Sequence, residues 1–164
     1  MTIARNTTLA LGLAAVLAGC APIVGVNGNS TTPPSAQTKQ RFQGGTTNMT
    51  FSAHGTQVEF LSRDGRTALW YPGNSVVLHG RWRLVGSDLT TGFQDNICFM
   101  YGANTYNPLT LQYGGQWECE GISTYAGEIV DRVTGDPFGL DKRAAVPFVL
   151  PGERTTFAAL LKRR

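Results

Sequence analysis

Short runs of alternating apolar and polar residues, separated by turn signals, fill residues 57–101 and constrain the fold more than any other feature. An Asp-Gly pair between two such runs, as at Asp64-Gly65, is a strong signal for a β-hairpin. The alternation predicts strands with one apolar face, and so an antiparallel meander. The expected strands are 57–60, 67–71, 75–78, 81–85, 97–101 and 116–120, and the expected reversals among the first four lie at 63–66, 72–74 and His79-Gly80.

Helical periodicity is confined to the C-terminus of the chain. Phe157, Leu160 and Leu161 recur at i, i+3 and i+4 behind a candidate cap at Thr155 or Thr156. We expect one short helix here that covers one end of a curled sheet, because open sheet edges invite aggregation. The predicted fold is therefore mainly β, a small antiparallel meander or partly closed barrel with a short C-terminal helix.

The N-terminus has the organisation of an export signal. Arg5 supplies a positive charge ahead of the uncharged apolar stretch Leu9–Leu17, and small residues precede Cys20. This stretch is too short for a membrane-spanning helix, which needs about 20 apolar residues. The sequence therefore predicts a signal peptide over residues 1–19.

The tetrapeptide Leu17-Ala18-Gly19-Cys20 resembles the lipobox of bacterial lipoproteins at every position. The resemblance implies cleavage before Cys20, a diacylglyceryl group on its thiol and acylation of its amine, so that three acyl chains hold the protein on a membrane. Because Ala21 rather than Asp follows the cysteine, enterobacterial-type sorting implies the outer membrane, with the domain facing the periplasm or the cell surface. The alternative is an ordinary thiol beside a signal cleavage site.

If Cys20 carries lipid, the mature chain keeps two cysteines, Cys98 and Cys119. A cysteine pair in the oxidising cell envelope is expected to form a disulfide. A Cys–His metal site is the first alternative, but the chain offers only His54 and His79 beside the two cysteines, and neither has a close ligand spacing. A catalytic thiol is the second, and oxidation opposes it.

The domain organisation follows from composition. Residues 20–45 are expected to form a lipidated tether, because they are rich in small polar residues, contain Pro33-Pro34 and lack apolar periodicity after Val26. Residues 46–164 then form a single small β domain.

Charge and motifs exclude several functions. The balance of 14 Lys and Arg against 11 Asp and Glu is too even for nucleic-acid binding, which uses clustered basic residues. The glycine pairs Gly44-Gly45 and Gly114-Gly115 do not fit a phosphate-binding loop. We expect no cofactor, no metal and no catalytic residues, since the two histidines lie near predicted turns and the carboxylates are scattered. Distant acids can still converge in space, so a glycosidase stays open.

The segment between the two cysteines of the mature domain is the best candidate for a binding surface. Its aromatic residues stand among Gly, Asn and Gln, and Tyr and Trp give a large contact area at low entropic cost. Such a loop suits stacking on sugar rings or insertion into a partner's cleft. The alternative is that these rings fill the core. The candidate binding residues are Tyr101, Tyr106, Tyr113 and Trp117, joined by Trp70 and Tyr71 before the Pro-Gly turn.

Two looser resemblances concern the domain. The strings GRWRLV, ICFMYG and WEC, within residues 56–120, resemble small secreted β domains of unknown function in proteobacteria, which implies no activity. The lipobox with a small disulfide-tied β domain is similar to the membrane-anchored lysozyme inhibitors. Their inhibitory motif, Ser-Gly followed two residues later by Tyr, is absent from YGANTY at Tyr101–Tyr106.

Three functions are therefore compatible with the sequence. The leading one is a non-enzymatic envelope lipoprotein, held on the membrane through Cys20, whose β domain binds a protein or glycan partner. The second is a protein inhibitor of a cell-wall hydrolase such as lysozyme. The third is a hydrolase of envelope polymers, which would need two carboxylates, or a histidine and a carboxylate, facing each other in a cleft.

Overall fold

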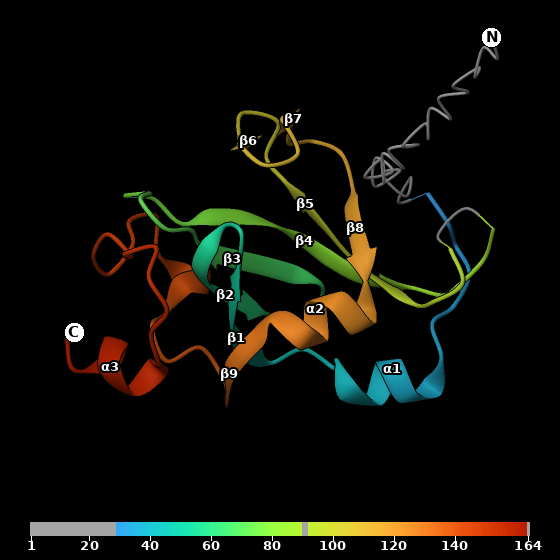
Figure 1. Ribbon diagram of the computed structural model, residues 1–164, viewed down its shortest axis with the longest axis horizontal. Helices are drawn as coiled ribbons and strands as arrows, with labels where there is room; N and C mark the ends of the chain where they lie inside the picture. The colour runs from blue at the N-terminus through green and yellow to red at the C-terminus, as the bar shows by residue number, and fades with distance from the viewer. Residues whose placement is uncertain (1–28, 90–91, 164) are drawn as a thin grey trace, which may run out of the picture.

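The computed structural model describes residues 29–89 and 92–163, which form a curled antiparallel sheet with short helices packed on it (Figure 1). Seven strands lie in the order β8-β5-β4-β3-β2-β1-β9. The sheet is a half-barrel, which confirms the predicted mainly β meander. Its strands are β1 (Thr46–Ser52), β2 (Gly55–Leu61), β3 (Arg66–Trp70), β4 (Leu78–Val85), β5 (Asn96–Tyr101), β8 (Glu118–Gly121) and β9 (Ile129–Thr134). The other elements are α1 (Ala36–Arg41), the small two-stranded sheet of β6 (Tyr106–Asn107) and β7 (Gln112–Tyr113), α2 (Ile122–Glu128), the 3-10 helix η1 (Leu140–Lys142) and α3 (Phe157–Leu161).

Turn residues set the hairpins of this meander. The predicted reversal at Asp64-Gly65 joins β2 to β3, and Gly65 has a positive φ of 80°. Glycine adopts this backbone conformation without the steric penalty that other residues carry. The hydroxyl of Ser62 braces the turn by accepting a hydrogen bond from the Arg66 amide at 2.7 Å.

The reversal predicted at His79-Gly80 is wrong, because β4 runs through both residues without interruption. Gly80 pairs with Thr67 on one side and with Tyr101 on the other. A Cβ atom at Gly80 would lie 2.5 Å from the Met100 carbonyl oxygen. Glycine at this position therefore permits the close approach of β4 and β5, and the chain does not turn there. The expected strand 75–78 is replaced by the start of β4 at Leu78.

Helix α2 joins the two edge strands of the sheet, since it begins directly after β8 and ends directly before β9. It lies across one face of the half-barrel (Figure 1), which we call the α2 face. The prediction that helix is confined to the C-terminus is thus wrong. Ile122, Tyr125 and Ala126 recur at helical spacing and all pack into the core on this face. That core cluster is built from Phe42, Leu61, Trp82, Ile97 and Tyr125.

The opposite face of the sheet is covered by residues 136–163, and we call it the C-terminal face. Its core is larger, and Trp70 at its centre packs edge-on against Phe138 and Phe148. The predicted C-terminal helix is present as α3, and its cap is Thr156, whose hydroxyl accepts a hydrogen bond from the Ala159 amide at 3.2 Å. Two α3 side chains, Phe157 and Leu160, belong to this core.

The tether predicted over residues 20–45 is wrong for its second half. Ser35 caps helix α1 by accepting a hydrogen bond from the Thr38 amide, and Phe42 is buried against Tyr125. The folded unit therefore begins before Thr46, the predicted boundary. The predicted signal peptide and Cys20 lie outside the described residues. Among the residues that the structure describes, no helix is long and apolar enough to cross a membrane.

Candidate functional site

The chain between Cys98 and Cys119 leaves the sheet and forms the hairpin of β6 and β7, which stands beyond the ends of β5 and β8 (Figure 1). The two cysteines are directly paired on adjacent strands, with Cα atoms 4.0 Å apart, and their disulfide confirms the prediction. We call residues 105–114 the aromatic hairpin. The disulfide ties together the two strands from which it arises.

Several hydrogen bonds brace the base of the aromatic hairpin. The Thr105 amide donates to the Gly102 carbonyl at 2.9 Å, and the Gly114 amide donates to the Thr105 carbonyl at 3.0 Å. A Cβ atom at Gly114 would lie 2.2 Å from the Gly102 carbonyl oxygen, so only glycine fits this contact. On the other side, the Asn107 amide group donates to the Glu118 carboxylate at 2.9 Å. The hairpin is therefore held in one orientation relative to β8.

The tip of the aromatic hairpin exposes four large apolar side chains. The rings of Tyr106 and Tyr113 lie 5.1 Å apart, and these side chains are 50% and 69% exposed. Leu111 is 71% exposed, and Leu109 is exposed as well. No charged residue occurs between Gly102 and Trp117. The tip is thus an uncharged, largely apolar patch on a braced support.

The other four predicted binding residues lie elsewhere. Trp70 is wholly buried and its indole N–H donates to the Phe148 carbonyl at 3.0 Å. This burial corrects the prediction that Trp70 contributes to a binding surface. Trp117 is half-buried, with the Arg83 guanidinium 4.3 Å from its ring centre. The positions of Tyr71 and Tyr101 are set by polar partners.

Tyr71 and His54 form a pair at the end of the sheet from which the hairpin rises. The Tyr71 hydroxyl and the His54 Nδ1 lie 2.9 Å apart, and the two rings meet edge to face. Burial lowers the pKa of His54, and the negative charge of Glu118 acts in the opposite direction. Both side chains are half-buried, so the pair forms part of the surface at this end of the sheet.

Tyr101 turns inward on the α2 face, where its hydroxyl donates to the carboxylate of Glu59. The Thr67 hydroxyl donates to the same carboxylate oxygen at 2.6 Å. Glu59 is only 8% exposed. Burial raises its pKa to about 7, although the hydrogen bonds from Thr67 and Tyr101 act in the opposite direction. This acid therefore retains its proton on a large fraction of molecules near neutral pH.

A second polar group lies beside Glu59 on the same face. Asn48, which pairs with Glu59 across β1 and β2, accepts a hydrogen bond from Arg132 at 2.7 Å and donates to the Tyr125 hydroxyl at 3.0 Å. Burial, together with the charges of Glu128 and Glu59, raises the pKa of Glu120 to about 8. Sequence reasoning missed this polar group, because its members come from β1, β2, β3, β5, β8, β9 and α2. They are Asn48, Glu59, Thr67, Tyr101, Glu120, Tyr125 and Arg132.

The polar group on the α2 face offers protonated carboxyls, which are the chemistry of a general acid. Glu120 is half-buried, but access argues against that use for Glu59, which is buried on this face. Its hydrogen bonds are satisfied by Thr67 and Tyr101. We therefore regard the group as a polar part of the core that fixes the packing of α2.

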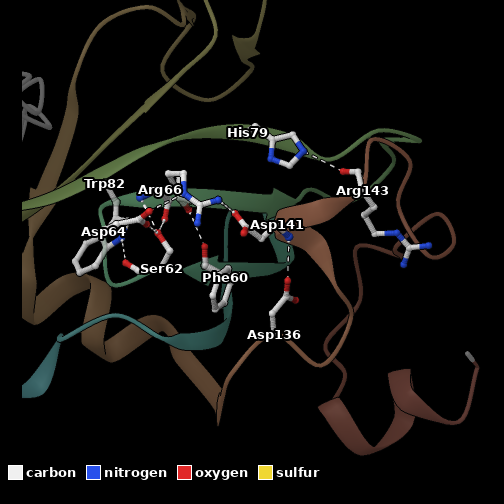
Figure 2. A network of polar contacts seen from close by, with 10 residues as sticks. Phe60, Ser62, Asp64, Arg66, His79, Trp82, Asp136, Asp141 and Arg143 are labelled. Carbon is white, nitrogen blue, oxygen red and sulfur yellow. Dashed lines mark hydrogen bonds and ion pairs between the residues drawn. The ribbon is translucent and has the colours of Figure 1, made fainter.

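Figure 2 shows a separate polar network that joins the β2–β3 turn to the C-terminal segment. Arg66 forms ion pairs with Asp64 at 2.9 Å and with Asp141 at 2.5 Å, and these partners raise its pKa. Asp141 in turn donates its backbone amide to Asp136 at 2.9 Å. On the neighbouring strand, a His79 ring nitrogen lies 2.9 Å from the carbonyl oxygen of Arg143. The network fastens residues 136–143 to the sheet.

Comparisons with known proteins add no functional information to the geometry described above. Within residues 29–89 and 92–163, no group of three or more His, Cys, Asp and Glu side chains could hold a metal ion. No family model, no curated protein and no solved structure matches this chain.

Proposed function

We propose that this chain is a lipid-anchored protein of the bacterial cell envelope whose β domain binds a partner protein, without catalysis, through the aromatic hairpin. The observation that carries the proposal is the exposed set Tyr106, Leu109, Leu111 and Tyr113 on a braced support. The centres of protein interfaces are depleted of charge and enriched in aromatic residues, as this tip is. A support that is ordered before binding reduces the entropy lost on association.

A protein partner fits the tip better than a glycan does. Sugar rings stack on flat aromatic faces flanked by polar groups, whereas the planes of Tyr106 and Tyr113 are tilted by 53° and two exposed leucines flank them. Exposed leucines gain free energy only where a partner removes them from water, at about 25 cal/mol per Å² of apolar surface. The apolar content of the tip thus favours a protein surface.

Substituting both tyrosines of the tip tests this proposal. Tyr106→Ala with Tyr113→Ala is expected to weaken partner binding at least about tenfold, because hot-spot side chains contribute about 2 kcal/mol or more each. The measurement is retention of envelope proteins on the immobilised domain, followed by titration of each purified candidate by calorimetry. Val149→Ala is the matched control, since Val149 is also exposed but lies on the C-terminal segment.

Two outcomes would contradict the hairpin proposal. Unchanged affinity in the double variant would remove the tip from the interface. Retention on purified peptidoglycan, with loss in the double variant, would replace the protein partner with a glycan. Neither result bears on the proposed membrane anchor, because fatty-acid labelling of Cys20 tests the anchor separately.

The membrane anchor is supported by the lipobox and by the disulfide, which is typical of oxidising compartments outside the cytoplasm. Cys20→Ser is expected to abolish labelling by a radioactive or alkyne-tagged fatty acid and to leave the precursor uncleaved or release the protein from membranes. The control is Cys98→Ser with Cys119→Ser, which removes the disulfide and leaves the lipobox intact. Fatty-acid labelling that persists in Cys20→Ser would contradict the proposed membrane anchor.

A narrower version of the same binding function is inhibition of a cell-wall hydrolase. A braced hairpin that projects from a sheet is suited to fill a cleft, and this geometry favours the idea over catalysis by the domain itself. Titration of the domain against lysozymes decides it, since unchanged turnover at saturating domain concentration removes the inhibitor version. The hydrolase alternative has little support, because Glu59 is buried and hydrogen-bonded.

A further inference from the structure

Two apolar side chains at the opposite end of the sheet from α3 are almost wholly exposed. Leu89 is 93% exposed and Phe93 is 97% exposed, and both lie in the connection between β4 and β5. With Ser87, Asp88 and Gly92 they border a shallow, open hollow. Exposed leucine and phenylalanine side chains so close together are more than the scattered apolar residues of an ordinary surface.

The N-terminal segment of the described chain is pinned to this same connection. The Thr32 hydroxyl donates to the Asp88 carboxylate at 2.7 Å, and the Ser30 hydroxyl donates to the same group. The Gly86 amide donates to the Thr32 carbonyl at 2.7 Å, and the Ser35 hydroxyl donates to Asp95 at 2.6 Å. Figure 1 shows the blue N-terminal segment beside the yellow-green connection, with α3 at the far end of the molecule.

The length of chain between Cys20 and this point limits where Leu89 and Phe93 can lie. Ten residues lead from Cys20 to Ser30, and a fully extended chain of that length spans at most about 36 Å. A lipid group on Cys20 would therefore keep the connection within that distance of the bilayer. A tether this short raises the effective concentration of a weak membrane contact, which becomes intramolecular.

We propose that Leu89 and Phe93 insert into the headgroup region of the bilayer that holds Cys20, so that the domain stands with this end on the membrane. The inference rests on the proposed lipid anchor and adds an orientation to it. Apolar side chains gain by insertion into the interface between headgroups and acyl chains, where phenylalanine and leucine are common anchors. The carboxylates of Asp88 and Asp95 accept hydrogen bonds from hydroxyl groups of the N-terminal segment, which hold them against that segment with their negative charge intact. Because Leu89 and Phe93 are apolar, we expect their contact with the bilayer to be insensitive to salt.

An environment-sensitive fluorophore tests the insertion without any need for lipidation of Cys20. The mature chain carries a hexahistidine tag in place of Cys20 and binds phosphatidylcholine vesicles that contain a nickel-chelating lipid. Phe93→Cys then offers one free thiol for the dye NBD, since Cys98 and Cys119 are joined. We expect about a twofold rise in NBD emission with a blue shift on vesicles, unchanged by high salt.

Matched labels at other exposed leucines give the controls. Leu161→Cys lies on α3 and Leu111→Cys lies on the aromatic hairpin, and both should keep the emission of dye in water. Leu89→Ser in the Phe93→Cys background should reduce the response.

Three results would overturn the inference. One is equal emission at all three labels, another is a response at Leu111→Cys alone, and the third is a response at Phe93→Cys that depends on protein concentration without vesicles, which indicates self-association. Because the nickel lipid replaces the acyl chains, failure here is distinct from failure of fatty-acid labelling at Cys20.

Discussion

At about pH 8, the Glu59→Gln variant is expected to have a free energy of unfolding up to about 3 kcal/mol higher than that of the unmodified chain. Burial raises the pKa of Glu59 from 4.5 to about 7 in the folded protein. The folded state thus binds this proton more tightly than the unfolded state does. Stability from Glu59 is fully present below pH 4.5 and is lost as the pH rises through about 7. Glutamine keeps an acceptor oxygen for Thr67 and Tyr101 and does not ionise.

Urea unfolding followed by tryptophan fluorescence, from about pH 5 to about pH 8, measures this effect. The unmodified chain should lose stability across the range, and Glu59→Gln should lose less. Part of the slope should remain, because burial also raises the pKa of Glu120 to about 8. Glu153→Gln, at an exposed carboxyl, is the matched control and should leave the slope unchanged. A slope that is the same in all three proteins would show that Glu59 is not buried as described.

Replacing Trp70 with alanine is expected to lower the free energy of unfolding by about 3–5 kcal/mol, the usual cost of truncating a buried tryptophan. Trp70 is wholly buried, and its ring centre lies 5.3 Å from that of Phe138 and 4.8 Å from that of Phe148. Truncation leaves a cavity on the C-terminal face and removes the donor to the Phe148 carbonyl. Residues 136–163 should loosen from the sheet as a result.

Trp70→Phe tests an intermediate truncation. It keeps a six-membered aromatic ring but loses the indole N–H and part of the ring volume, so we expect a smaller loss than for alanine, about 1–2 kcal/mol. Urea midpoints give the free energies, and limited proteolysis reports whether the C-terminal segment has loosened. A loss below about 1 kcal/mol for Trp70→Ala would mean that Trp70 is not at the centre of this core.

Most of the fold can be predicted from local patterns in the sequence. Alternation and an Asp-Gly turn are signals within a few residues, so they predict the β2–β3 hairpin and the C-terminal helix correctly. The predicted reversal at Gly80 is wrong, because a glycine needed for the close approach of two strands cannot be distinguished from a turn glycine in the sequence. Helix α2 was missed although Ile122, Tyr125 and Ala126 have helical spacing, since the helix has only seven residues and no side-chain cap.

The candidate site was predictable only in part. The sequence singled out Tyr106 and Tyr113, but strand alternation alone could not decide which of Trp70 and Tyr71 is buried. Leu109 and Leu111 were overlooked because an apolar residue in a polar loop is as often turned inward as outward. The contact between Glu59 and Tyr101 joins β2 to β5. No local sequence pattern indicates a contact between residues so far apart in the chain.

Because Cys98 and Cys119 face each other on adjacent strands with a sequence separation of 21, the segment between them is a covalently closed ring whose two ends join the sheet side by side. A protease that nicks the exposed tip would leave both fragments joined, and they would separate only under reducing conditions. Changes in the length or sequence of the aromatic hairpin reach the sheet through β5 and β8, the strands from which it arises. Such a scaffold can exchange one recognition tip for another while its fold stays the same.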